Sequence, residues 1–237
     1  MSIFDVKVCL GTNPLPVLSE QRIANQTSKP LAIDMQNNHN IDVKKSTEGK
    51  IPMDQDTATK VKAFEYFTNH LVDWYKEQNH EQEFSDNDLS KLKVLKIHFF
   101  VCASRASEKE DGLLDVFDNF WAMPYGHVES DVYTWLDKLD YIRIDNYKLD
   151  IVKEYLDDYF LDLDSDIKKR IDESFVAVKS TNAKLVNYMA VDLVELSHTW
   201  YSWKSMYKLA RSFKKYSMKI PKEIIKSENK IYSLKGV

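Results

Sequence analysis

Residue types that carry out catalysis or bind metals are present in this chain, but not at the spacings that such chemistry needs. The six histidines are scattered and there is no HExxH or CxxC motif, so we expect no metal site. Cys9 and Cys102 lie far apart, and no GxSxG motif marks an activated serine. Five glycines, no two of them close together, exclude a Walker A loop or a dinucleotide fingerprint. We therefore expect no enzymatic activity and no cofactor.

Two other groups of ionisable residues have ordinary structural interpretations. His98 lies inside an apolar segment, where we expect a hydrogen-bonded core residue and not a metal ligand. The carboxylates of residues 157–166 recur regularly, which is typical of a solvated face and not of a catalytic pair.

The most informative segment is FWAMPYGHVESDVYTWL, residues 120–136, which concentrates aromatic residues around a Pro-Tyr-Gly turn. Pro124 fixes its own φ angle, and Gly126 provides a permissive backbone where the chain must bend. We expect a structural corner that holds two helices together, with His127 hydrogen-bonded across it. The alternative is a partner-binding groove, for which the candidate residues are Trp121, Tyr125, His127 and Tyr133.

A second candidate surface lies near residue 200, where helices are expected to meet. Trp and Arg are enriched at the energetic centres of protein interfaces, and basic residues follow this segment. We expect either packing against the preceding helix or contact with a partner. The candidate residues are His198, Trp200, Trp203 and Lys204.

Charge is unevenly distributed along a chain whose net charge is −4. Residues 137–166 contain ten acidic and four basic residues, a net of −6, whereas residues 204–237 contain ten basic and two acidic residues, a net of +8. Either the two segments attract each other within the fold, or the basic one meets an acidic partner or nucleic acid. Without a global basic field, we do not expect direct nucleic-acid binding.

Hydrophobic periodicity predicts a mainly α fold, a compact bundle of about seven or eight helices. Residues 1–56 are polar and proline-containing, and we expect a largely flexible extension there, followed by a helical domain over 57–237. Residues 113–122 are compatible with a short helix or a strand. Helices are expected at 57–78, 89–107, 128–139, 148–160, 167–178, 202–216 and 221–229, with another capped by 180–182 and extending through Leu196.

The sequence also bears on cellular location. The first residues lack the basic and long apolar regions of a secretory signal, and no apolar stretch reaches about 18 residues. Two distant cysteines suggest no disulfide framework. We expect a cytoplasmic protein without a membrane partner.

Four blocks together resemble the Panacea domain, also called the SocA-like antitoxin domain. They are LSKLKVLKIHFFVCASRAS, FWAMPYGHVESDVY, DLVELSHTWYSWKSMYKLA and IPKEIIKSENKIY, and they occur in the order of that family over roughly residues 58–232. The second block is fairly specific, with its Tyr-Gly-His-Val turn and a later Val-Tyr pair. Two features depart from the family: His127 stands where proline is common, and residues 1–56 match nothing.

The resemblance implies a mainly α domain that is the antitoxin of a bacterial toxin–antitoxin pair, found in some cases in prophages. Its partner would be a cognate toxin, neutralised by direct protein binding. The alternative is an adaptor that presents a client protein to a cytosolic protease, or another phage-related interaction protein.

Overall fold

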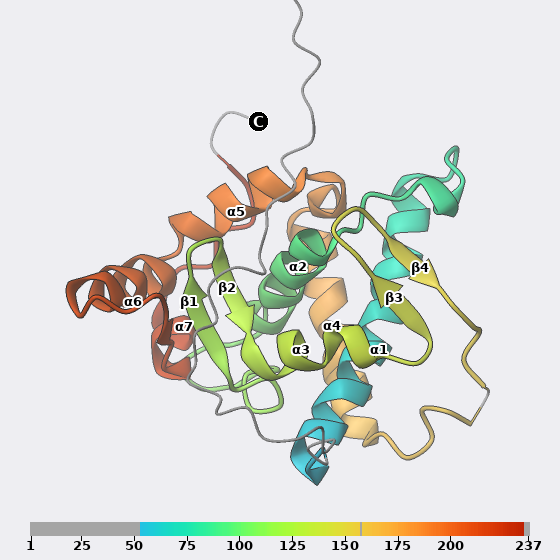
Figure 1. The fold of residues 1–237 in the computed structure, drawn as a ribbon, viewed down its shortest axis with the longest axis horizontal. Helices are drawn as coiled ribbons and strands as arrows, with labels where there is room; N and C mark the ends of the chain where they lie inside the picture. The colour runs from blue at the N-terminus through green and yellow to red at the C-terminus, as the bar shows by residue number, and fades with distance from the viewer. Residues whose placement is uncertain (1–52, 157, 235–237) are drawn as a thin grey trace, which may run out of the picture. The chain divides into compact units, whose positions relative to one another are not determined.

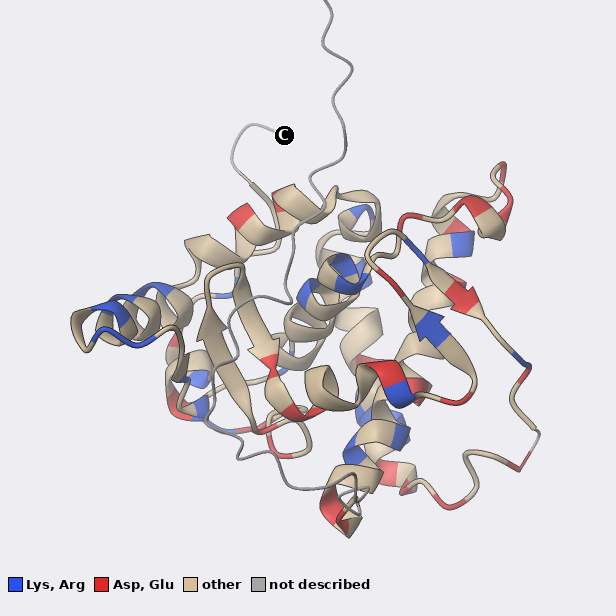
Figure 2. Ribbon diagram, in the orientation of Figure 1, with Lys and Arg blue, Asp and Glu red and all other residues tan. Residues whose placement is uncertain are grey.

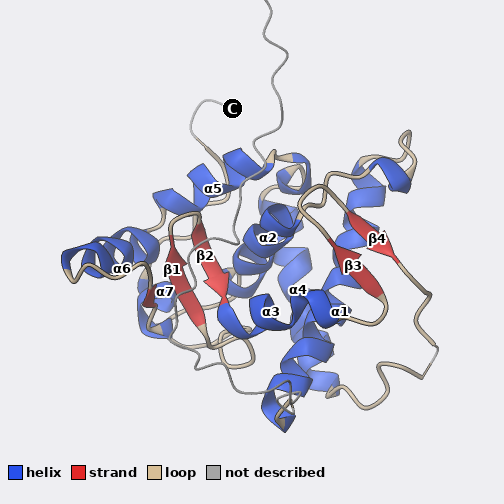
Figure 3. Ribbon diagram, viewed as in Figure 1, coloured by secondary structure: helices blue, strands red, loops and turns tan. Residues whose placement is uncertain are grey.

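The computed structural model of the chain describes residues 53–156 and 158–234. The extension expected at residues 1–56 therefore lies almost wholly outside the described residues. Within the described part, seven α-helices alternate with five short strands (Figures 1 and 3). A helix-rich fold is confirmed, but an exclusively helical bundle is wrong, because two small sheets are built into it.

The helices and strands have the following bounds. The helices are α1 (Gln55–Gln78), α2 (Lys91–Ala103), α3 (Ser130–Trp135), α4 (Ser165–Thr181), α5 (Ala190–Thr199), α6 (Tyr201–Ser212) and α7 (Lys222–Ser227). The strands are β1 (Phe120–Met123), β2 (Gly126–Glu129), β3 (Ile142–Ile144), β4 (Leu149–Ile151) and β5 (Met218–Lys219). No helix in the described part of the chain has the length and apolar character needed to cross a bilayer.

Helix α2 is the centre of the fold. Its N-terminus is capped by Ser90, whose hydroxyl accepts a hydrogen bond from the backbone N–H of Lys93 over 3.3 Å. From Leu92 to Ala103 every residue is buried, because α2 is in contact with β2, α4 and α5 (Figure 1). An apolar surface on more than one side thus predicted the central position of this helix.

His98, midway along α2, is buried as expected, but it is not hydrogen-bonded. Neither ring nitrogen has a partner, and the ring instead meets Phe64, Phe67 and Phe117 edge to face. Burial, helped by the charge of Lys60, lowers the pKa of His98 to about 3, so the ring is neutral. The expectation of a hydrogen-bonded core histidine is wrong in this respect.

The first sheet replaces the start of a helix that was expected at residue 128. Strand β1 lies between β2 and β5, with antiparallel pairing to both. Residues 126–129 extend because they pair with β1, so α3 begins only at Ser130. The carboxylate of Glu129 caps that helix by accepting from Val132 N–H over 2.7 Å. The structural corner is therefore a hairpin followed by a helix.

The helix expected at residues 148–160 is absent from the described residues, and β3 and β4 form a second hairpin there. Asp145 makes the turn, since its carboxylate accepts from Tyr147 N–H and Lys148 N–H over 2.7 and 2.8 Å. Buried Asn87 then pins Leu149 in an extended conformation through two amide hydrogen bonds of 2.8 and 3.0 Å. These contacts outweigh the local helical pattern.

Candidate functional site

The tight turn between β1 and β2 organises the candidate site. Pro124 and Tyr125 form its two-residue loop, because Met123 and Gly126 are paired across the hairpin. Gly126 has a φ of +98°, a conformation that residues with a side chain rarely adopt. Tyr125 is left at the tip of the turn with 37% of its surface exposed.

His127 follows the turn and lies in the protein interior, where it joins β2 to α5 and α6. Its Nδ1 lies 2.8 Å from the hydroxyl of Ser197 in α5, and its Nε2 lies 2.8 Å from the hydroxyl of Ser202 in α6. Its backbone N–H donates to the same Ser197 hydroxyl over 3.1 Å. The ring is stacked on Phe99 of α2, with 3.5 Å between ring centroids. His127 therefore links three helices to the hairpin.

A serine hydroxyl beside an imidazole is also the nucleophile–base pair of serine hydrolases. Burial lowers the pKa of His127 well below its usual value, and the charge of Lys96 lowers it further, so the ring is neutral. His127, Ser197 and Ser202 are all fully buried. A substrate could reach the hydroxyls only by displacing core side chains, so in this conformation the three groups act as a structural link.

A buried lysine lies behind this link. The ammonium group of Lys96, in α2, donates a hydrogen bond to the carbonyl oxygen of His127. The side chain is fully buried, and burial alone lowers its pKa to about 7. No carboxylate in the described part of the chain forms an ion pair with it. A charged Lys96 is thus an energetic cost that the fold carries beside the candidate site.

Gly126 faces the side chains of Ser197 and Lys96, and this contact gives a first prediction. A Cβ atom on Gly126 would overlap Ser197 Oγ and would lie 2.9 Å from Ser197 Cβ and 3.3 Å from Lys96 Nζ. We expect Gly126→Ala to lower the free energy of unfolding by about 1–3 kcal/mol from backbone strain, and further through steric overlap. Urea denaturation followed by circular dichroism measures the change. An unchanged unfolding midpoint would contradict the role given to this glycine.

The outer side of the junction between α5 and α6 carries a stack of aromatic rings. His198 at the end of α5 is stacked on Trp203 of α6, with 3.7 Å between centroids and 19° between ring planes. Trp203 is stacked in turn on Tyr207, at 4.8 Å and 15°. The indole N–H of Trp203 donates to Met123 O over 2.8 Å, and His198 Nε2 lies 3.2 Å from Pro124 O. Both contacts fasten the stack to the β1–β2 turn.

Further tyrosines extend this stack towards the hairpin tip. Partial burial raises the pKa of Tyr216, and so do electrostatic interactions with Tyr125, Tyr207 and Tyr133, which places these hydroxyls near one another. We call the half-exposed and exposed rings together the aromatic strip. It consists of His198, Trp203, Tyr207, Tyr216 and Tyr125.

The structure separates the eight candidate residues into three groups. His127 and Trp200 are fully buried, and the indole N–H of Trp200 donates to Ile231 O over 2.9 Å, so neither side chain can touch a partner in this structure. Trp121 and Tyr133 are half-buried, and Trp121 donates to Asn119 Oδ1 over 2.9 Å. The structure brings the other four together at the surface: Tyr125, His198, Trp203 and Lys204.

Several residues of this junction were not identified from the sequence. Ser197 and Ser202 give no signal of their own, because a serine in a helix is usually unremarkable. Lys96 does give one, since a lysine within an apolar helix must be buried or must face a partner. Tyr207 and Tyr216 continue the spacing of Trp203 and could have been included with it.

A second group of charges fastens the base of the hairpin to α1. The ammonium group of Lys60 lies 2.7 Å from Asp118, 3.1 Å from Glu129 and 2.5 Å from Asp131. Burial alone would lower the pKa of Lys60, but attraction to Glu129 and hydrogen bonds to Asp118 and Asp131 raise it above its usual value. Burial raises the pKa of Glu129 despite the nearby lysine.

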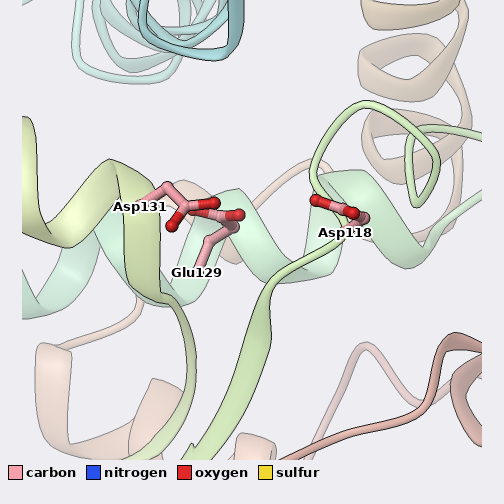
Figure 4. A group of neighbouring side chains, drawn as sticks. All are labelled: Asp118, Glu129 and Asp131. Atoms are coloured by element: carbon pink, nitrogen blue, oxygen red, sulfur yellow. The ribbon is translucent and has the colours of Figure 1, made fainter. Parts of the chain in front are cut away.

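The carboxylates around Lys60 could by themselves hold a cation. Their ligand oxygens lie within 4.8 Å of one another, and oxygen-rich groups of this kind suit Mg²⁺ or Ca²⁺. Figure 4 shows Glu129 and Asp131 side by side, with Asp118 across from them. In this structure the ammonium group of Lys60 bonds to all three and serves as their cation, so the group is a structural one.

A hollow of 250 Å³ lies elsewhere, between α4 and the loop before β1. Its charged side chains are already paired: Arg105 lies 3.3 Å from Glu173, and Arg170 lies 2.6 Å from Asp115. These internal pairs leave the junction of the β1–β2 turn with α5 and α6 as the stronger candidate. Comparison of the chain with protein-family models, curated proteins and solved structures gives no match.

Proposed function

We propose that this chain is an antitoxin of the type that the Panacea-like motifs imply, which neutralises a cognate toxin by direct protein binding. One observation carries the proposal. The two motif blocks that contain YGHV and LSHTWYSW, about 70 residues apart in sequence, meet in a single junction through His127, Ser197 and Ser202. The motif residues thus specify one surface, and they do not line an open cleft.

The exposed side of this junction has the composition of a protein interface. It places Trp203, Tyr125 and Lys204 beside one another, and large aromatic side chains contribute contact area at a small cost in conformational entropy. Trp203 and His198 are held in position by hydrogen bonds to the turn, so the surface is organised before a partner binds. A preorganised aromatic surface suits a protein that acts by binding.

A growth assay tests the proposal. We expect expression of a small open reading frame adjacent to this gene to stop growth, and co-expression of this chain to restore it. The double variant Tyr125→Ser, Lys204→Glu should lose protection, because both side chains are exposed at the proposed surface. The matched control Tyr147→Ser, Lys109→Glu changes an exposed tyrosine and lysine on other elements and should protect fully.

Two results would count against this function. If no adjacent gene is toxic, the antitoxin proposal fails at its first step. If the gene is toxic but the double variant protects as well as the control, the junction is not the surface that binds the toxin. Circular dichroism of both variants shows that the folds are retained.

A further inference from the structure

Helix α6 and the residues after it expose six cations on the described surface. They are Lys204, Lys208, Arg211, Lys214, Lys215 and Lys219. Figure 2 shows this concentration of basic residues along α6. None of the six forms an ion pair with any residue in the described part of the chain, although Lys222 and Lys226 beyond them both pair with Asp111.

The acidic segment of the chain does not neutralise these cations. Asp137, Asp150 and Asp162 pair with Lys91, Lys148 and Lys62 respectively, all of which lie outside α6. Mutual attraction of the two charged segments, one of the two interpretations of the sequence, is therefore not how the described acidic residues are paired. The charge of α6 remains directed towards solvent.

The cations of α6 run parallel to the aromatic strip. Lys204, Lys208 and Arg211 follow one another at steps of four and three, so they lie on one face of the helix, which we call the basic stripe. Trp203 and Tyr207 each precede one of these lysines and lie about 100° away around the helix axis. The basic stripe and the aromatic strip are thus adjacent along about two turns of α6.

The stacking of the aromatic rings indicates what kind of anion would bind here. His198, Trp203 and Tyr207 already lie face to face with one another, so their faces are not free for a nucleobase to stack on. Ring edges carry partial positive charge, and tyrosine hydroxyls can donate hydrogen bonds. An edge of this kind beside a row of cations favours carboxylates over nucleobases.

Apolar side chains complete the surface. Tyr201 is 65% exposed and Phe213 is 64% exposed, and Leu209 is also exposed on the same helix and its continuation. Single exposed apolar residues are ordinary, but here three lie within 13 consecutive residues together with unpaired cations. A polypeptide can satisfy both features, because its apolar side chains cover the rings while its carboxylates meet the cations.

We propose that the basic stripe and the aromatic strip form a docking surface for an acidic segment of a partner polypeptide. The partner's carboxylates would pair with Lys204, Lys208 and Arg211, and its apolar side chains would lie against Tyr201 and Leu209. The inference deepens the proposed function and rests on it for the partner's identity, which would be the toxin.

Binding of a labelled synthetic peptide that alternates glutamate with leucine tests the surface without the toxin. Fluorescence anisotropy should show saturable binding that weakens as ionic strength rises to about 0.15 M, since the charges are exposed to solvent. The triple variant Lys204→Glu, Lys208→Glu, Arg211→Glu should bind at least about tenfold more weakly at low salt. These side chains are exposed and unpaired, so their reversal leaves the fold intact, as circular dichroism will show.

A matched control reverses two lysines and one arginine on other elements. Lys109, Arg143 and Lys184 are likewise exposed and form no ion pair within the described residues, so their reversal to glutamate should leave peptide binding unchanged. Equal losses in the two triple variants would show attraction by overall charge and would overturn the proposal. Tighter binding of polyuridine than of the peptide, abolished by the α6 variant, would overturn it in favour of nucleic acid.

Two further outcomes separate this inference from its relatives. Concentration-dependent dimerisation in light scattering, lost in the α6 variant, would overturn it in favour of a second copy of the chain. Peptide binding that depends on α6, together with a failed growth assay, would support the docking surface and reject the antitoxin function. A successful growth assay that the α6 variant does not impair would support the function and reject this surface.

Discussion

Replacement of Lys60 by methionine is expected to lower the free energy of unfolding by about 3–5 kcal/mol at neutral pH. The side chain of Lys60 is 10% exposed and bonds to three carboxylates, one of which, Glu129, is fully buried. Methionine fills the same space without a charge. The variant therefore leaves a buried carboxylate without its cation, and the loss of that pairing dominates the effect.

The pH dependence of this deficit follows from Glu129. Burial already raises the pKa of Glu129 above that of an unfolded glutamate, and removal of Lys60 would raise it further. A group whose pKa is raised by folding contributes stability below its unfolded pKa, and that contribution is lost as pH rises through the folded pKa. The deficit of the variant should thus be largest near neutral pH and should shrink towards about pH 4.

Two further variants test this explanation. Lys62→Met removes a lysine from the same helix, but its partner Asp162 is 71% exposed, so we expect a loss of less than about 1 kcal/mol. Adding Glu129→Gln to Lys60→Met should recover part of the loss at neutral pH. Urea denaturation at several pH values measures all three. Equal losses for Lys60→Met and Lys62→Met would show that the carboxylate cluster is no more than a surface ion pair.

Elements specified by neighbouring residues could be predicted from the sequence. Helix α1 begins where Asp54 accepts a hydrogen bond from Thr57 N–H over 2.7 Å, two residues before the expected start. Its apolar spacing placed Phe64, Phe67 and Leu71 correctly in the core. Caps and periodicity suffice here because every contact that defines the helix lies within four residues of its partner.

Elements specified by distant residues could not be predicted in this way. The strand at Leu149 depends on Asn87, which lies 62 residues earlier in the sequence. The link between His127 and Ser197 spans 70 residues, so neither residue announces the other. The motif resemblance drew attention to both segments, but only the fold brings them together and shows that His127 and Trp200 face inward.

Replacement of Lys96 by methionine is expected to raise stability, in contrast to the loss at Lys60. The ammonium group of Lys96 is fully buried and donates to the carbonyl oxygen of His127, with no carboxylate partner among the described residues. Methionine has a similar length and no charge to desolvate. At about pH 6 we expect the variant to unfold with a free energy about 3–5 kcal/mol greater than that of the unchanged chain.

This advantage should vanish as the lysine loses its proton. Burial lowers the pKa of Lys96 to about 7, whereas an unfolded lysine titrates near 10.4. Between these values the unfolded chain binds more protons than the folded one, so the stability of the unchanged protein rises with pH over this interval. The variant lacks this rise, and the two unfolding free energies should therefore converge towards about pH 10.

Lys93→Met provides the matched control, one turn earlier on the same helix. Lys93 is equally buried, but its ammonium group lies 2.6 Å from the carboxylate of Asp88, which offsets part of the desolvation. Its replacement should bring a smaller gain, or a loss, with a weaker dependence on pH. If Lys96→Met instead shows a constant difference from the unchanged chain across this range, Lys96 does not titrate as a buried amine. The electrostatic account of the junction beside the candidate site would then be wrong.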